Sequence, residues 1–244
     1  MNQPAFTELD LPADLLKNLE SLKYHQMTPV QSQALPLALA GSDVIAQAKT
    51  GSGKTVAFGL ALLANLDAKK YKIQSLVLCP TRELADQVAT EIRLLARAIH
   101  NVKVLTLTGG TSIRPQIESL ERGAHIIVGT PGRIEDHLDR GTLSLEAVNT
   151  LVLDEADRML QMGFQESIDK IVKFISAERQ TLLLSATYPD EIKSIANRLL
   201  KTPEMIVVDA EHSNDHIQQH FYSCLLYTSP SPRDQRGSHM PSSA

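Results

Sequence analysis

The chain has 244 residues, of which 43% are hydrophobic and 21% charged, and its formal net charge is -4. This composition excludes a disordered or collagen-like chain, and no apolar run approaches the roughly 20 residues that a membrane helix needs. The net charge argues against a generally basic nucleic-acid coat but leaves a local nucleic-acid groove open. Two cysteines give neither a disulfide framework nor a zinc site, and the acidic, mixed N-terminus is unlike a signal peptide, so we expect a cytoplasmic protein.

Seven short strands are predicted, separated by amphipathic helical stretches. Most strands are apolar at consecutive positions, as in Leu151-Val152-Leu153, which is typical of strands buried on both faces of a parallel sheet. Strand and helix alternate, so we predict an α/β domain with a mostly parallel central sheet of about seven strands and helices on both faces. Ligands of such sheets bind beyond the carboxyl ends of the strands. The predicted strands are Val44–Ala48, Ser75–Cys79, Lys103–Leu107, His125–Val128, Thr150–Leu153, Thr181–Leu184 and Met205–Val208.

A glycine-rich segment follows the first predicted strand and precedes a helical run, Val56–Leu63. It fits the phosphate-loop pattern G-x-x-x-x-G-K-[ST], with Ala48 in place of the first glycine. Small residues let successive N–H groups face an anion, and the helix adds its positive end. Lys54 would reach the β- and γ-phosphates, and Thr55 would place its hydroxyl on Mg²⁺. The strand–loop–helix context disfavours a chance glycine-rich turn. The candidate phosphate-binding residues are Ala48, Lys49, Thr50, Gly51, Ser52, Gly53, Lys54 and Thr55.

An acidic cluster, Asp154-Glu155-Ala156-Asp157, follows the predicted strand Thr150–Leu153. An acid directly after an apolar strand is the expected second half of a phosphate-loop NTPase site. We predict that Asp154 holds Mg²⁺ through water and that Glu155 orients or deprotonates the attacking water, so that Lys54, Asp154 and Glu155 are the catalytic candidates. Taken alone, such a cluster would be read as a solvated helix start.

The acidic cluster spells D-E-A-D, and residues near 4–222 resemble the first RecA-like domain of the DEAD-box RNA helicases in motif order and spacing. The resemblance implies a RecA-like phosphate-loop NTPase fold, ATP or ADP with Mg²⁺ as cofactors, RNA as partner, and a parent enzyme that separates short RNA duplexes. A DNA helicase or another phosphate-loop ATPase is the weaker rival. The motifs that carry the resemblance are Ala46–Thr55, Pro80–Leu84, Gly109-Gly110, Thr130–Arg133, Asp154–Asp157, Ser185–Thr187 and the glutamine motif Tyr24–Gln31.

The glutamine motif implies adenine recognition, with Phe6, Tyr24, Thr28 and Gln31 at the nucleotide. A glutamine amide has both a donor and an acceptor, so it can pair with adenine, whereas guanine presents the reverse pattern. Tyr24 would give the base an aromatic surface. The motif departs from the family at Lys23 and Met27, where Gly and Pro are common. Without the other motifs, Gln31 would be read as a surface residue.

The resemblance also places an RNA-binding surface on three loops. Two of them follow predicted strands and open helices, so they offer helix N-termini and backbone N–H groups to phosphates. The alternative for Arg82 and Arg133 is a structural salt bridge, and each could serve in both ways. The implied RNA-binding residues are Pro80, Thr81, Arg82, Gly109, Gly110, Thr130, Pro131, Gly132 and Arg133.

A further group, Asp157, Ser185 and Thr187, is implied to couple the nucleotide state to the RNA cleft. Hydroxyl-to-carboxylate hydrogen bonds are charge-assisted, which suits this role. The alternative is an ordinary turn at the end of a strand.

We expect residues 1–222 to be an N-terminal RecA-like ATP-binding domain and residues 223–244 to be a disordered tail. Gly237–Met240 resembles a cloning scar, although a native Pro/Ser linker is the alternative. The second RecA-like domain is expected to be absent, so the chain alone would be a monomer and at most a nucleotide- and RNA-binding module with little turnover. The flanks of the motifs resemble one bacterial family member most, which implies ribosomal RNA and ribosome assembly.

Overall fold

A computed structural model describes residues 3–208 of the chain. The predictions for the end of the domain and for the tail, residues 209–244, lie outside this range. No helix between residues 3 and 208 combines the length and the apolar character that crossing a membrane requires.

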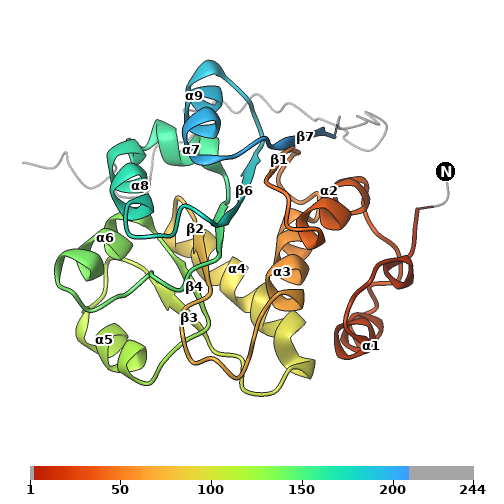
Figure 1. The fold of residues 1–244 in the computed structure, drawn as a ribbon, viewed down its shortest axis with the longest axis horizontal. Helices are drawn as coiled ribbons and strands as arrows, with labels where there is room; N and C mark the ends of the chain where they lie inside the picture. The colour runs from red at the N-terminus through yellow and green to blue at the C-terminus, as the bar shows by residue number, and fades with distance from the viewer. Residues whose placement is uncertain (1–2, 209–244) are drawn as a thin grey trace, which may run out of the picture. The chain divides into compact units, whose positions relative to one another are not determined.

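A sheet of seven parallel strands forms the centre of the described chain (Figure 1), as predicted. Its strand order is β3-β4-β2-β5-β6-β1-β7, and all six pairings are parallel. The observed bounds lie within about a residue of the predicted ones. The strands are β1 (Val44–Gln47), β2 (Ser75–Leu78), β3 (Val104–Leu107), β4 (Ile126–Gly129), β5 (Thr150–Leu153), β6 (Gln180–Ser185) and β7 (Glu204–Val207).

Helices cover both faces of the sheet, with α2, α3 and α4 on one side and α5, α6 and α8 on the other (Figure 1). The helix after β1 begins two residues before its predicted start, because the Lys54 turn is already helical. The helix after β2 is α4, which gives way to a 3₁₀ turn, Ala96–Ala98. The helices are α1 (Ala13–Ser21), α2 (Pro29–Leu39), α3 (Lys54–Ala64), α4 (Arg82–Leu95), α5 (Arg114–Glu121), α6 (Pro131–Asp139), α7 (Ala156–Gln161), α8 (Gln165–Val172) and α9 (Asp190–Leu199).

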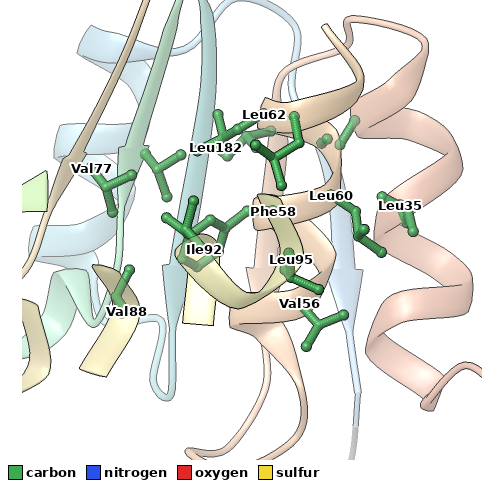
Figure 2. Close-up of a cluster of buried hydrophobic side chains, with 14 of the residues drawn as sticks. Leu35, Val56, Phe58, Leu60, Leu62, Val77, Val88, Ile92, Leu95 and Leu182 are labelled. Carbon is green, nitrogen blue, oxygen red and sulfur yellow. The ribbon is translucent and has the colours of Figure 1, made fainter. Parts of the chain in front are cut away.

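Two hydrophobic cores form because successive strand residues point to opposite faces. In β2, Val77 packs with α2, α3 and α4, whereas Leu76 and Leu78 pack with the helices of the other face. Figure 2 shows the first core, where Phe58 of α3 and Ile92 of α4 lie against the sheet. Burial of both faces explains the consecutive apolar residues that the sequence shows in each strand.

The strand order sorts the loops that follow the strands into two groups. The strands β1, β6 and β5 are neighbours, and so are β2, β4 and β3. Because all strands are parallel, their carboxyl ends lie at one edge of the sheet. We call the loops after the first three the β1–β5–β6 loops and those after the others the β2–β3–β4 loops. Every predicted nucleotide motif after a strand falls in the first group and every predicted RNA motif in the second.

Candidate nucleotide site and RNA-facing loops

The predicted phosphate loop curls between β1 and α3. Gly51 and Gly53 have φ angles of 82° and 93°, a left-handed backbone that favours glycine. Lys54, the first residue of α3, is buried, and its Nζ donates to the carbonyl of Ala48 across the loop. The hydroxyl of Ser52 is also buried and has no hydrogen-bond partner in the described residues. Lys49 and Thr50 are exposed at the tip. The loop therefore surrounds a space with a cation and an unused hydroxyl.

The glutamine motif is joined directly to this loop. Gln31 is only 3% exposed. Its Oε1 accepts from the Thr28 N–H at 2.8 Å, and its Nε2 donates to the Gly53 carbonyl at 3.0 Å. Gly53 has to be glycine here, because a Cβ would lie 2.5 Å from the Gln31 Nε2. An amide has four hydrogen-bonding positions, so one donor and one acceptor of Gln31 stay available after these two bonds.

The two aromatic residues of the glutamine motif lie in different places. Tyr24 is half-buried, and its hydroxyl donates to the Glu91 Oε1 at 2.9 Å. Burial and the neighbouring Glu91 carboxylate raise the pKa of Tyr24. Phe6, in contrast, is 2% exposed within the hydrophobic core, and it lines a neighbouring hollow with Tyr24 rather than the cleft at the phosphate loop. Phe6 thus supports the segment that carries Tyr24.

The departures from the family in this motif have structural consequences. Lys23 adopts a φ of 63°, the left-handed region in which glycine is at ease. Met27 is buried in the core, and its N–H donates to the Pro4 carbonyl at 2.8 Å. A proline at this position could not donate that hydrogen bond.

The acidic cluster begins where β5 ends, beside the phosphate loop. Asp154 and Glu155 are 3% and 5% exposed. Glu155 Oε1 accepts from the Thr50 hydroxyl at 3.2 Å, and its Oε2 accepts from Arg158 Nη1 at 2.5 Å. Glu155 has a φ of 53° at the start of α7, a local strain that turns its side chain toward the loop.

Burial shifts the pKa of both charged groups that face each other across the site. It raises the pKa of Asp154 to about 6, while the positive charge of Lys54 acts in the opposite direction. Burial also lowers the pKa of Lys54, against the attraction of Asp154, Glu155 and Asp157. A desolvated carboxylate with two acidic neighbours would be relieved by a cation.

The predicted coupling residues contact one another across β5 and β6. The Asp157 Oδ2 accepts from the backbone N–H and the hydroxyl of Thr187, at 3.0 and 2.8 Å. The Asp157 N–H donates to the Ser185 hydroxyl at 3.3 Å. These bonds connect the acidic cluster to the loop after β6, so that a displacement of one segment would displace the other.

One cleft of about 380 Å³ collects residues of the loops after β1 and β5 and of the glutamine motif. Thr55 and Asp154 both line it, and their oxygen atoms form the kind of donor set that Mg²⁺ takes. The buried, unpartnered hydroxyl of Thr28, which lines the cleft, suits a ligand rich in acceptor oxygens. The residues present therefore fit Mg²⁺ with a nucleotide. The cleft is lined by Tyr24, Gln26, Thr28, Gln31, Thr50, Gly51, Gly53, Lys54, Thr55, Val56, Leu84, Glu91, Asp154 and Glu155.

The β2–β3–β4 loops also meet one another. Thr81 is the N-cap of α4, where its hydroxyl accepts from the Leu84 N–H at 3.3 Å, and Pro80 before it is buried. Arg82 is exposed, and its guanidinium fills the space where a Cβ of Gly110 would lie. Gly109 has open space around it.

The loop after β4 reaches the same place. Arg133 donates from Nη2 to the Thr111 carbonyl at 2.8 Å, and its Nη1 is buried without a partner in the described residues. The α6 helix starts at Pro131 behind Thr130, and a Cβ at Gly132 would meet nothing within 4 Å. Thus Arg82, Gly110 and Arg133 are brought together beside two helix N-termini.

Both arginines also make ion pairs, which is what the alternative role as structural salt-bridge residues requires. Arg82 pairs with Glu83 at 3.3 Å, and Arg133 lies 3.9 Å from Asp136. The Arg82–Glu83 pair is exposed and contributes little stability, whereas the Arg133 side chain is only 11% exposed. The two readings of these arginines therefore remain compatible.

Comparison with known proteins agrees with this geometry. The model of the DEAD/DEAH box helicase family matches residues 28–195. The chain belongs to this family. It is 56% identical over 219 residues to the ATP-dependent RNA helicase DbpA of Escherichia coli (strain K12), covering 89% of this chain and 48% of that protein. It is 48% identical to the DEAD-box ATP-dependent RNA helicase CshA of Geobacillus kaustophilus, covering 88% of this chain and 46% of that protein.

The solved structures include a similar fold. The crystal structure of a DEAD box protein from the hyperthermophile Methanococcus jannaschii superposes with a TM-score of 0.80 at 40% sequence identity. The match covers 84% of this chain and 56% of that one. The RecA-like DEAD-box fold predicted from the sequence is thereby confirmed. The chain spans about half the length of the curated relatives it matches.

Three residues of this family member's site were not singled out from the sequence. Arg158 bonds the Glu155 carboxylate, and its i, i+3 spacing from Glu155 could have indicated the contact. Glu91 bonds Tyr24 from 67 positions away, and Thr111 accepts from Arg133 through its backbone. Neither of these two contacts leaves a pattern in the sequence.

Proposed function

We propose that this chain is the ATP-binding half of an ATP-dependent RNA helicase, which couples ATP binding and hydrolysis to local unwinding of RNA duplexes. The observation that carries the proposal is the single cleft that joins Gln31, Lys54, Asp154 and Glu155. In the proposal, residues 1–222 form the RecA-like domain and a second RecA-like domain completes the enzyme. We further propose a cytoplasmic monomer that acts on ribosomal RNA during ribosome assembly, as the resemblance of the motif flanks implies.

Adenine recognition would use the free positions of the Gln31 amide. The two bonds to Thr28 and Gly53 fix the orientation of the amide, so its remaining donor and acceptor have defined directions. Adenine offers an exocyclic amine and a ring nitrogen that match this pair. Guanine offers a carbonyl where adenine has the amine, which would leave buried polar groups unpaired. Tyr24, held by Glu91, would stack on the base.

The phosphate loop and the acidic cluster, on the other side of the cleft, would bind the phosphates and carry out hydrolysis. Lys54 would exchange the Ala48 carbonyl for the β- and γ-phosphates, and the loop N–H groups would bind their oxygens. Thr55 and Asp154 would hold Mg²⁺, which supplies charge neutralisation when bound. Glu155, released from Thr50, would orient the attacking water and accept its proton.

RNA would lie across the β2–β3–β4 loops. The N-termini of α4 and α6 point backbone N–H groups away from the sheet, and Arg82 and Arg133 stand beside them. Phosphate contacts of this kind bind RNA without reading its sequence. The Asp157–Thr187 contact would transmit the nucleotide state toward these loops.

The decisive test adds a second RecA-like domain to this chain. We would join this chain to the second RecA-like domain of its natural protein and measure ATP hydrolysis with and without RNA, and separation of a short RNA duplex. In the proposal, the second domain supplies an arginine finger, which contributes about 10³–10⁵ in rate in related phosphoryl transfer. The joined protein should therefore show RNA-stimulated hydrolysis that the single domain lacks.

Matched lysine variants complete this test. Lys54→Ala in the cleft should abolish hydrolysis, and Lys17→Ala on the exposed face of α1 should leave it unchanged. Failure of the joined, folded protein to hydrolyse ATP with any RNA would contradict the proposal. The outcome would then favour a nucleotide- and RNA-binding module.

A further inference from the structure

A basic loop lies at the opposite edge of the sheet from both groups of functional loops. It joins α3 to β2 and reads Lys69-Lys70-Tyr71-Lys72. It precedes β2, whereas the loop with Pro80 and Thr81 follows it. With about 3.3 Å per strand residue, the four residues of β2 separate the two edges by roughly 13 Å. Neither the nucleotide site nor the proposed RNA path uses this edge.

Two buried polar side chains hold this loop in place. The Gln74 amide accepts from the Asp67 N–H at 2.9 Å and donates to the carbonyls of Asp67 and Lys70, at 2.8 and 3.0 Å. The His125 ring accepts from the Lys103 N–H at 3.1 Å, and its other nitrogen lies 3.2 Å from the Ala68 carbonyl. The loop is therefore a fixed feature of the fold.

Tyr71 is displayed on this fixed loop. It is 53% exposed, more than any other large hydrophobic side chain in residues 3–208. Its ring rests against the ring of His125, with centroids 5.1 Å apart. Gly123 lies beside it, and a Cβ there would be 3.7 Å from the Tyr71 side chain. One edge of the ring is thus held while the rest faces solvent.

Four exposed cations belong to the segments that meet here: Lys69 and Lys72 lie on the loop itself, Lys103 bonds the His125 ring through its N–H, and Arg122 precedes Gly123. With Tyr71 they form what we call the Tyr71 patch. The Lys103 Nζ donates to the Arg122 carbonyl at 3.0 Å, which brings the last two together. Within the described residues, none of the four makes an ion pair, whereas neighbouring Lys70 pairs with Asp67 at 3.2 Å. A chain with a net charge of -4 therefore gathers unpaired positive charge at this place.

A hollow of about 370 Å³ opens beside the Tyr71 patch. Tyr71 and Lys72 form one wall, and the segment with Thr142, Ser144 and Glu146 forms another. The lining offers hydroxyls and a carboxylate as hydrogen-bonding groups next to the aromatic ring. Such a mixture suits a nucleobase, which carries both donors and acceptors and a face that can stack on the ring, while the phosphates of the same strand would lie on the cations and away from Glu146.

We propose that the Tyr71 patch is a second contact site for single-stranded RNA, with Tyr71 stacking on a base and the four cations binding phosphates. Stacking on aromatic side chains beside a positive surface is the general mode of binding single strands. The inference rests on the proposed function only in the choice of RNA as ligand. The site would hold a strand that extends beyond the proposed RNA path and so raise the affinity of the enzyme for longer RNA.

The test is fluorescence anisotropy of this chain with labelled oligouridine at low salt. Tyr71→Ala should weaken binding about five- to tenfold, and Tyr71→Phe should retain it, because the ring is kept. Lys72→Glu should lower the salt dependence of log K by about 0.7 for each phosphate that the patch no longer neutralises. Thermal unfolding of each variant would verify that the chain is folded.

The chain supplies a matched control just after α8, where exposed Lys173 and Phe174 place a lysine next to an aromatic residue in the chain. Lys173→Glu with Phe174→Ala should leave RNA binding unchanged, because the nearby Lys170 is already paired with Glu135 and Asp139. Photocrosslinking with 4-thiouridine RNA should label the peptide that contains Tyr71.

The outcomes separate this inference from the proposed function. If Arg133→Ala weakens RNA binding while Tyr71→Ala and Lys72→Glu do not, the proposed RNA path stands and the Tyr71 patch is overturned. Suppose that RNA does not crosslink to the Tyr71 peptide, that no substitution in the patch weakens RNA binding, and that an aspartate-rich peptide binds there instead. The patch is then a protein-docking surface and the inference is wrong. Absence of any RNA binding by the folded chain contradicts both.

Discussion

The two groups of loops at the carboxyl edge of the sheet use their polar groups differently. In the β1–β5–β6 loops, Lys54, Glu155 and Asp157 are buried and bonded to other residues of the site. In the β2–β3–β4 loops, Arg82 and Gly132 are exposed at helix starts, and a Cβ at Gly132 would meet nothing within 4 Å. The side chains of the first group are already bonded to one another without a ligand. The second group exposes backbone N–H groups to which a ligand can bind. Substitutions should therefore cost more in the first group than in the second.

The largest difference is expected for the chemical step. In the joined two-domain protein, Glu155→Gln should lower the rate of ATP hydrolysis by roughly 10²–10⁴, because the amide cannot accept the proton of the attacking water. RNA affinity should change little, since Glu155 lies among the β1–β5–β6 loops. Glu118→Gln, an exposed position on α5, is the control and should leave both quantities unchanged. Normal ATP hydrolysis by Glu155→Gln would show that Glu155 is not the group that accepts the proton of the attacking water.

Two glycines compare the packing of the two groups. Gly53→Ala places a Cβ 2.5 Å from the Gln31 Nε2 at a φ of 93°, so it should destabilise the domain by about 2–4 kcal/mol. Gly132→Ala meets nothing within 4 Å in the first turn of α6 and should stabilise it by about 0.5–1 kcal/mol. Urea unfolding of both variants measures the difference. Equal effects would contradict the distinction between closed and open loops.

Particular elements show which features of the structure the sequence predicts and which it does not. The strands were predictable because each is buried on both faces and its residues are apolar in succession. The strand order was not predictable from such runs, and it is this order that separates the nucleotide motifs from the RNA motifs. Contacts such as Gln31 with Gly53 or Tyr24 with Glu91 join residues that lie far apart in the chain. Phe6 is buried in the core, a position that its sequence interval alone does not reveal.

The buried carboxylate of the nucleotide site should make stability depend on pH. The folded pKa of Asp154 is about 6, above the ordinary value of 3.8, so the folded state holds this proton more tightly than the unfolded state. Its contribution to stability is therefore lost as the pH rises from about 4 to 6. Asp154→Asn should stabilise the ligand-free domain at pH 7 by on the order of 1–3 kcal/mol, and hardly at pH 4. Denaturant titrations at the two pH values test this, and a gain that is the same at both would contradict it.

The smallest effect is expected at the edge of the glutamine motif. Lys23 adopts a φ of 63°, so Lys23→Gly should relieve backbone strain and stabilise the domain by about 0.5–1 kcal/mol. Lys17→Gly, within α1, should instead destabilise by about 1 kcal/mol. Thermal unfolding of both variants distinguishes the signs. A loss of stability in Lys23→Gly would show that the Lys23 side chain stabilises the fold by more than the strain of its backbone destabilises it.

The central claim is that this domain alone forms an adenine-reading site. Isothermal titration calorimetry with ADP and with GDP, both with Mg²⁺, tests it directly on the chain, on Gln31→Ala and on the control Gln33→Ala, an exposed residue of the same helix. The account predicts that ADP binds more tightly than GDP, that Gln31→Ala loses this preference and that Gln33→Ala keeps it. Equal binding of ADP and GDP by the unmodified chain would contradict it.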